Sequence, residues 1–150
     1  ITKKQAGEYI ANYLARFHAI DSYLKDTVRM AYDHGFVETI FGRRRYIPEL
    51  KASNKMMRSF GERVAMNSPI QGSAADIIKI AMVNTRNALA AANIDARLIL
   101  QVHDELVVEA ARTCADEAAM ILRREMENAV SLSVPLSVDL TVGDTWYENK

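Results

Sequence analysis

Hydrophobic residues recur at helical spacing through the first third of the chain. After Thr2, a possible N-cap, the apolar positions follow one face of a helix, and the period continues to Gly35. The pattern predicts two helices, or one bent helix, ending at that glycine. These apolar positions are Tyr9, Ile10, Tyr13, Leu14, Phe17, Ile20, Leu24, Val28 and Ala31.

The pattern then changes from helical spacing to strand-like alternation. Residues 36–41 alternate, and residues 42–48 follow with three consecutive arginines, Arg43, Arg44 and Arg45. This predicts a short hairpin or looped ribbon with the arginines at its bend.

Residues 58–67 return to a helical pattern that meets two helix breakers. Pro69 lacks an N–H and clashes with the preceding turn, so we expect a break or kink there, reinforced by Gly72. Ser73 with Asp76 resembles a capping box and predicts the start of a second helix. The apolar stripe of that helix is Ile78, Met82, Thr85 and Leu89.

The last third predicts a second hairpin, a helix and a final strand. Residues 96–102 and 106–109 are β-type runs separated by a tight turn, which gives an antiparallel hairpin. Thr113 and Asp116 then predict a capped helix to about Val130, followed by a strand over residues 135–142. The inward positions of that helix are Ala118, Ile121, Leu122, Met126 and Ala129. The predicted fold class is α+β, a single unit of helices packed on a small antiparallel sheet with a central hairpin.

Composition narrows the class of protein. A chain of 150 residues with 49% hydrophobic residues can bury a core, and its single cysteine, Cys114, excludes an internal disulfide. Apolar stretches are too short for a membrane span, so we expect a cytoplasmic protein.

Net charge is zero, but residues 1–75 hold 12 Lys/Arg and 7 Asp/Glu, while residues 76–150 hold 7 and 12. A cationic half could face phosphates and an acidic half could bind metals; chance scatter of surface charge is the alternative.

Two adjacent carboxylates, Asp104 and Glu105, stand at the tip of the second hairpin. Mg²⁺ takes carboxylate oxygens, so these two residues are candidate metal ligands. For an isolated Asp-Glu pair the simpler interpretation, a turn former beside a solvated strand end, is favoured.

Longer motifs change that balance. Residues 101–107 resemble the third conserved palm motif of family A (DNA polymerase I-like) DNA polymerases. Residues 63–76 resemble the helix and bend that precede this motif, residues 39–48 the family's arginine-rich segment, and residues 143–146 its C-terminal ending. Four ordered motifs across the chain identify a C-terminal portion of a bacterial polymerase. The resemblance implies fingers-side elements over about 1–57 and palm over about 58–150.

The resemblance also implies roles for individual residues. Asp104 would bind the catalytic metals, Glu105 would be an auxiliary carboxylate, and His103 would touch the primer terminus. The family's cofactor is a pair of Mg²⁺ ions, with Mn²⁺ as a substitute. Its partners are primer–template DNA and dNTP, and its location is the bacterial cytoplasm, associated with the nucleoid. Arg63, Asn67 and Gln71 match the residues that hold the duplex from its minor-groove side.

Spacing supports the duplex contact independently of the resemblance. Positions 63, 67 and 71 lie on one face of a helix, and donors there can test base-pair geometry without reading sequence. Pro69 could rotate Gln71 off that face, and a solvated helix edge is the alternative. For the ribbon, Arg43, Arg44 and Arg45 either neutralise backbone phosphates or pair with acidic neighbours.

Two parts of the family's active site have no counterpart in the sequence. Neither the upstream motif that carries the second essential aspartate nor the fingers helix that grips the triphosphate is present. We therefore expect a fragment that is inactive without the N-terminal portion of its polymerase and that could self-associate through an exposed sheet edge. The alternatives are a non-catalytic DNA-binding module derived from a palm and a structural domain with vestigial motifs.

Overall fold

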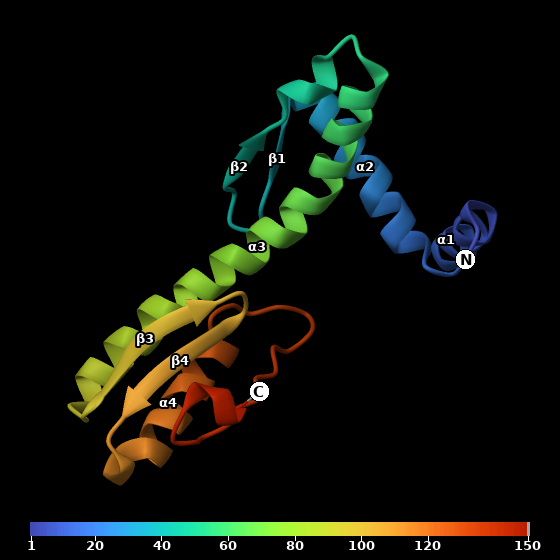
Figure 1. Cartoon of the computed structure of the whole chain (residues 1–150). Coiled ribbons are helices and arrows are strands. Elements are labelled where there is room, and N and C mark those ends of the chain that lie inside the picture. The colour runs from blue at the N-terminus through green and yellow to red at the C-terminus, as the bar shows by residue number, and fades with distance from the viewer. Residues whose placement is uncertain (150) are drawn as a thin grey trace. The chain divides into compact units, whose positions relative to one another are not determined.

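Two helices form the start of the chain, whose computed structural model describes residues 1–149. α1 spans Lys3–Arg16 and α2 spans His18–His34 (Figure 1). Thr2 caps α1 through a capping box, because its Oγ1 accepts from Gln5 N while Gln5 Oε1 accepts from Thr2 N. Gly35 ends α2 with a left-handed φ of 80°. The two-helix prediction is thus confirmed, including its cap and its end.

The arginine-rich segment folds as the predicted hairpin, the arginine ribbon (residues 36–46), but the placement of all three arginines at its bend is wrong, because Arg44 and Arg45 belong to its second strand. β1 (Phe36–Glu38) pairs antiparallel with β2 (Arg44–Tyr46), and a 3₁₀ turn, η1 (Pro48–Lys51), follows. The buried core beneath the ribbon joins residues from α2, the ribbon, η1 and α3. Its members are Ala31, Val37, Ile47, Leu50 and Ala65.

Of the break or kink predicted at Pro69, the break is wrong, because α3 is one helix over Lys55–Ala92 with Pro69 inside it. Proline costs about 3 kcal/mol in a helix interior. The packing of α3 before and after Pro69 outweighs this low helix propensity. Pro69 itself is buried, and Ser68 Oγ donates to Val64 O at 2.6 Å. Ser73 therefore lies mid-helix rather than at an N-cap, and its Oγ donates to Pro69 O at 2.5 Å. Gly72 does not interrupt the helix either.

The second hairpin is confirmed. β3 (Ala96–Val102) pairs antiparallel with β4 (Glu105–Ala110), and a shift of register between Leu98 and Leu100 marks a bulge at Ile99. The second half of α3 and α4 (Ala115–Glu127) pack with this hairpin. Two buried clusters result, one of Ala81, Leu106 and Ala129 and one of Leu89, Ala118 and Ile121.

Two details of the C-terminal prediction are wrong. α4 begins at Ala115 after the 3₁₀ turn η2 (Arg112–Cys114), so Thr113 is not its N-cap. Residues 135–142 form no strand, because a strand needs a hydrogen-bonded neighbour and none of the described residues supplies one. Val138 N donates instead to the Glu127 carboxylate at 3.2 Å. The chain continues to a short 3₁₀ turn, η3 (Trp146–Asn149).

The fold separates into two compact units, an N-terminal unit (Ile1–Ser73) and a C-terminal unit (Ala74–Lys150). The predicted α+β class is confirmed, although the strands form two separate two-stranded sheets rather than one. Division into fingers-side and palm segments near residue 57 stays a prediction. Within residues 1–149, no helix is both long enough and apolar enough to cross a bilayer.

Ile47 is the test of the N-terminal core, because it is 1% exposed and is the largest apolar side chain that is fully buried there. We expect Ile47→Ala to lower the free energy of unfolding by about 2–5 kcal/mol, since it leaves a cavity. Ile40→Ala is the matched control, because Ile40 is 58% exposed, and it should cost less than about 1 kcal/mol. Urea denaturation of the chain measures both. Equal losses would contradict this placement of the core.

Candidate functional site

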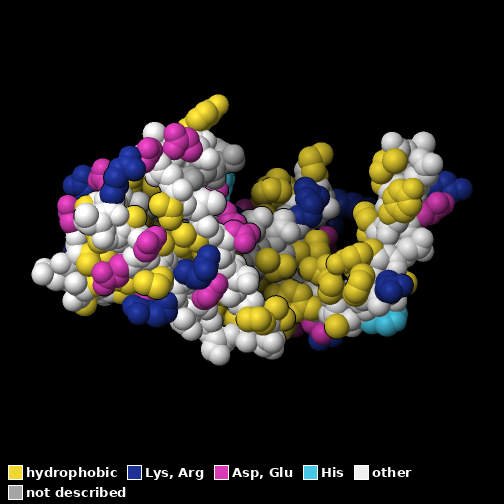
Figure 2. Space-filling view, turned by 90° about the horizontal axis from the view of Figure 1, so that it is seen from below, with side chains coloured by type: hydrophobic (Ala, Val, Ile, Leu, Met, Phe, Trp, Pro, Cys, Tyr) yellow, Lys and Arg dark blue, Asp and Glu magenta, His cyan; other side chains and the backbone are white. Residues whose placement is uncertain are grey.

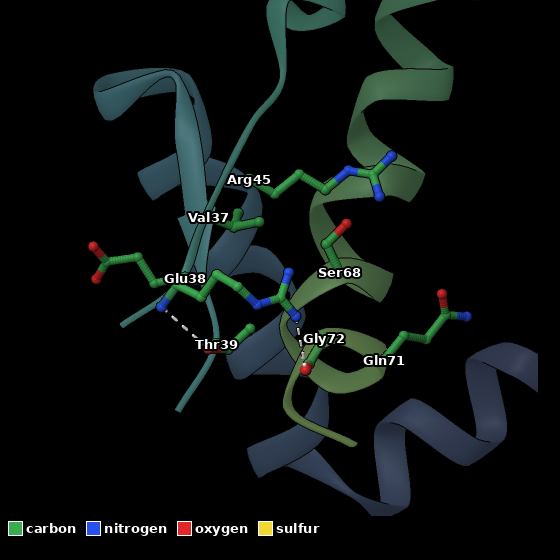
Figure 3. A pocket seen from close by; sticks show the side chains of 8 residues that line it. Val37, Glu38, Thr39, Arg45, Ser68, Gln71 and Gly72 are labelled. Carbon is green, nitrogen blue, oxygen red and sulfur yellow. Dashed lines mark hydrogen bonds between the residues drawn. The ribbon is translucent and has the colours of Figure 1, made fainter. Parts of the chain in front are cut away.

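A pocket of about 210 Å³ lies between the arginine ribbon and α3 within the N-terminal unit. It brings together three of the residues predicted to bind DNA: Arg43, Arg45 and Gln71. Figure 3 shows Arg45 extending from the ribbon towards Ser68 of α3, while Glu38 points away from that helix. The lining residues are Val37, Glu38, Thr39, Arg43, Arg45, Ser68, Gln71 and Gly72.

The three arginines of the ribbon have different surroundings. Arg44 Nε donates to Glu38 Oε1 at 2.8 Å, and its guanidinium carbon lies 4.6 Å from the centre of the Phe36 ring. The hydrogen bond with Glu38 raises the pKa of Arg44. Arg43 donates to Gly72 O at 3.0 Å. The side chain of Arg45 is exposed and has no hydrogen-bond or ion-pair partner among residues 1–149.

The two roles predicted for the ribbon arginines, phosphate binding and pairing with an acidic neighbour, therefore fit different residues. Arg44 fits the role of an arginine paired with an acidic neighbour. Arg45 keeps its guanidinium available for a ligand, and that group forms two parallel hydrogen bonds to phosphate.

Continuity of α3 decides the geometry of the polar row Arg63, Asn67 and Gln71. All three side chains are exposed, and positions four apart in an unbroken helix share a face. Pro69 is buried, so it lies on a different side of the helix from the row. Arg63 NH1 donates to Ser59 Oγ at 3.3 Å, and its guanidinium carbon lies 6.0 Å from the Phe60 ring centre. The row presents amide and guanidinium donors to solvent together.

His103 and Asp104 form the two-residue turn of the β3–β4 hairpin, because Val102 pairs directly with Glu105. His103 has a left-handed φ of 52°, and Gln101 Nε2 donates to its carbonyl at 2.5 Å. A non-glycine residue in this region costs about 1–2 kcal/mol, and such strain tends to cluster at functional sites. His103, Asp104 and Glu105 are all exposed. The hairpin thus holds two carboxylates in water beside a strained turn.

The donor set at this turn fits a hard cation in kind. Carboxylate oxygens are the ligands that Mg²⁺ prefers, and it commonly binds through one or two of them plus substrate phosphates. Within residues 1–149, no three His, Cys, Asp or Glu side chains gather closely enough to hold a metal by themselves. Asp104 and Glu105 can therefore supply part of a metal site.

Sequence reasoning missed Thr39, Ser68 and Gly72 as parts of the pocket. The sequence around Gly72 is typical of a helix breaker, but a glycine inside a helix can also mark a close approach of another backbone. It also missed a groove of about 1240 Å³ in the C-terminal unit, between β4, α4 and residues 137–146. Asp104 and Glu105 of the turn motif and residues 143–146 of the C-terminal motif line that groove, but neither motif predicted that they share it.

Comparison with known proteins identifies the family of this chain. The sequence model described as DNA polymerase family A matches residues 1–148, so the chain belongs to DNA polymerase family A. DNA polymerase I of Caldicellulosiruptor bescii is 49% identical over all 150 residues, and that of Bacillus subtilis is 48% identical over the same length. The chain spans 18% and 17% of these two relatives, respectively.

A solved structure has the same fold. It is the polymerase domain of Pol1 from M. smegmatis, in complex with DNA primer-template and dNTP. It matches with a TM-score of 0.93 and 44% identity, over 97% of this chain and 26% of that chain. The family resemblance found in the sequence is confirmed.

Backbone strain at His103 leads to a stability test. We expect His103→Val to lower the free energy of unfolding by about 1–2 kcal/mol, because a β-branched residue is poorly tolerated at positive φ. His103→Gly should lower it little or raise it, since glycine adopts this φ freely and the exposed side chain fills no core. Urea denaturation of both variants decides. Equal stability of the two would contradict the strained turn.

Proposed function

We propose that this chain is the C-terminal part of a DNA-directed DNA polymerase, which adds dNTPs to a primer 3′-hydroxyl. Within that enzyme it grips the primer–template duplex and supplies one part of the metal site. The observation that carries the proposal is the family match over residues 1–148, together with an unbroken polar row on α3 beside the arginine ribbon. Support also comes from the M. smegmatis relative, whose structure holds DNA and dNTP.

The polar row grips the duplex from its minor groove. Arg63, Asn67 and Gln71 are exposed on one face of α3. A·T and T·A pairs offer acceptors at equivalent places in the minor groove, so donors placed there detect a correctly shaped pair of any sequence. A copying enzyme needs this indifference to sequence.

The ribbon arginines bind the backbone of the same duplex. The guanidinium of Arg45 is exposed without a partner among the described residues, and Arg43 lines the same pocket. Phosphate contacts position a protein on DNA without carrying sequence information. Arg44 contributes less, because Glu38 already holds its guanidinium.

The β3–β4 turn supplies the chemistry of the metal site. Asp104 would hold the two Mg²⁺ ions, Glu105 would assist as an auxiliary carboxylate, and His103 would touch the primer terminus. When bound, such a pair of ions lowers the pKa of the attacking hydroxyl and stabilises charge at the phosphorus. Mn²⁺ would substitute.

The rest of the polymerase is the main protein partner in this proposal. α1 contains no buried residue, and Figure 2 shows exposed hydrophobic side chains gathered on the N-terminal helices, at the right of the view. In the C-terminal unit, β3 pairs only with β4 among the described residues, and Ile99 is 54% exposed. Without the rest of the polymerase, the free edge of β3 would pair with a second copy of this chain. A bacterial cytoplasmic, nucleoid-associated location follows from the family and stays a prediction.

Activity of the isolated chain is the first test. We expect no nucleotide incorporation on a primed template with Mg²⁺ or Mn²⁺, because the second essential aspartate and the triphosphate-binding helix lie in motifs that this sequence lacks. The assay follows primer extension on a denaturing gel, with the complete polymerase as the positive control. Primer extension by the purified chain would overturn this division of the active site.

A pair of arginine variants in the complete polymerase tests the duplex grip. We expect Arg45→Ala to weaken primer–template binding and to lower the slope of log K against log[salt] by about 1, because one phosphate contact is lost. Arg44→Ala is the matched control and should lower that slope less than Arg45→Ala does, since Arg44 is held by Glu38 and Phe36. Fluorescence anisotropy across a salt series measures both. Identical slopes for Arg45→Ala and the unaltered enzyme would refute this assignment.

A further inference from the structure

The bend of the arginine ribbon is fastened to α3 at two consecutive helical positions. Ile40 N donates to Ser73 Oγ at 3.0 Å, and Arg43 donates to Gly72 O at 3.0 Å. Ser73 is 8% exposed and also donates from Oγ to Pro69 O at 2.5 Å. One buried hydroxyl therefore links the ribbon backbone to the helix at its proline turn.

Gly72 is the position where ribbon and helix approach most closely. A Cβ at Gly72 would lie 2.7 Å from Thr39 Cγ2 and 3.3 Å from the Arg43 guanidinium. The first distance is too short for two non-bonded carbon atoms, so only glycine allows this contact without a shift. Figure 3 shows Thr39 and Gly72 facing each other across the contact. Of the described helical glycines, Gly7 meets nothing within 4 Å of such a Cβ.

Thr39 stiffens the same bend from the ribbon side. It is 9% exposed, and its Oγ1 accepts from Phe41 N at 3.3 Å and from Arg43 N at 3.2 Å. Gly42 completes the bend with a φ of 77°. A two-stranded ribbon with three residues in each strand is marginal by itself in water, so these contacts hold its shape.

We infer that Gly72 and Ser73 are positioning residues for duplex binding. They fasten the ribbon bend to α3, so that Arg43 and Arg45 are ordered beside the polar row before DNA arrives. Ordering these long side chains in advance lowers the entropy lost on binding, which raises affinity without a new contact. Neither residue touches DNA in this role. The inference rests on the proposed duplex grip and adds the device that aligns its two parts.

Gly72→Ala in the complete polymerase tests the close approach. Alanine favours a helix over glycine, so α3 itself is not weakened and the clash with Thr39 is isolated. We expect the affinity for primer–template DNA to fall by on the order of fivefold. The slope of log K against log[salt] should become smaller by about 1, because the ribbon arginines are no longer held beside the polar row. Gly7→Ala, the same substitution on α1 without a neighbour, should leave affinity and slope unchanged.

Thr39→Ser provides the compensating change. Serine removes the Cγ2 that a Cβ at position 72 would strike and keeps the hydroxyl that accepts from Phe41 N and Arg43 N. The double variant Gly72→Ala with Thr39→Ser should recover most of the lost affinity and the original salt slope. Ser73→Ala, which removes the acceptor of Ile40 N, should reproduce the loss, and Thr39→Ser should not repair it.

The outcomes separate this inference from the proposed function. If Arg45→Ala weakens binding but Gly72→Ala leaves both affinity and slope unchanged, the positioning role is overturned while the duplex grip stands. A loss in Gly72→Ala that Thr39→Ser does not restore also overturns it, because the cause is then not the Thr39 contact. If Arg45→Ala itself has no effect in the same assay, the duplex grip fails. Thermal unfolding of each variant identifies any loss due to unfolding.

Discussion

The continuity of α3 through Pro69 is the constraint on which the candidate DNA-binding surface depends. Because the helix does not break, positions 63, 67 and 71 keep one face, and Gly72 and Ser73 remain at helical positions where the ribbon can reach them. The missing N–H of Pro69 leaves the helix with one hydrogen bond fewer. Burial of Ala65 and Pro69 offsets that loss.

Charge is divided along the same boundary as packing. The N-terminal unit ends at Ser73, and residues 74 and 75 are alanines, so it carries the whole excess of 12 Lys/Arg over 7 Asp/Glu. The C-terminal unit carries the opposite excess and the carboxylates of the β3–β4 turn. A cationic unit suits the phosphate backbone, and an acidic one suits metal ions. Each unit thus has the charge that its proposed role requires.

Local patterns predicted what local contacts decide. The capping box at Thr2, the left-handed Gly35 and both hairpins follow from signals within a few residues of sequence. Elsewhere the same kinds of local signal gave wrong predictions, because tertiary contacts determine the structure there. Ser73 has the sequence signature of a cap, but its hydroxyl is used by Ile40, thirty-three residues earlier. The strand predicted over residues 135–142 alternates correctly but has no neighbouring strand among the described residues to complete its hydrogen bonds. The candidate metal-binding turn at His103 and Asp104 is predicted only through its long motif.

A crystal structure of the complete polymerase bound to a primer–template duplex tests the central claim most directly. The account predicts an unbroken α3, with Arg63, Asn67 and Gln71 lying along the minor groove and Arg45 at a backbone phosphate of the same duplex. A duplex bound to another surface, with the polar row and the ribbon left in solvent, would contradict it.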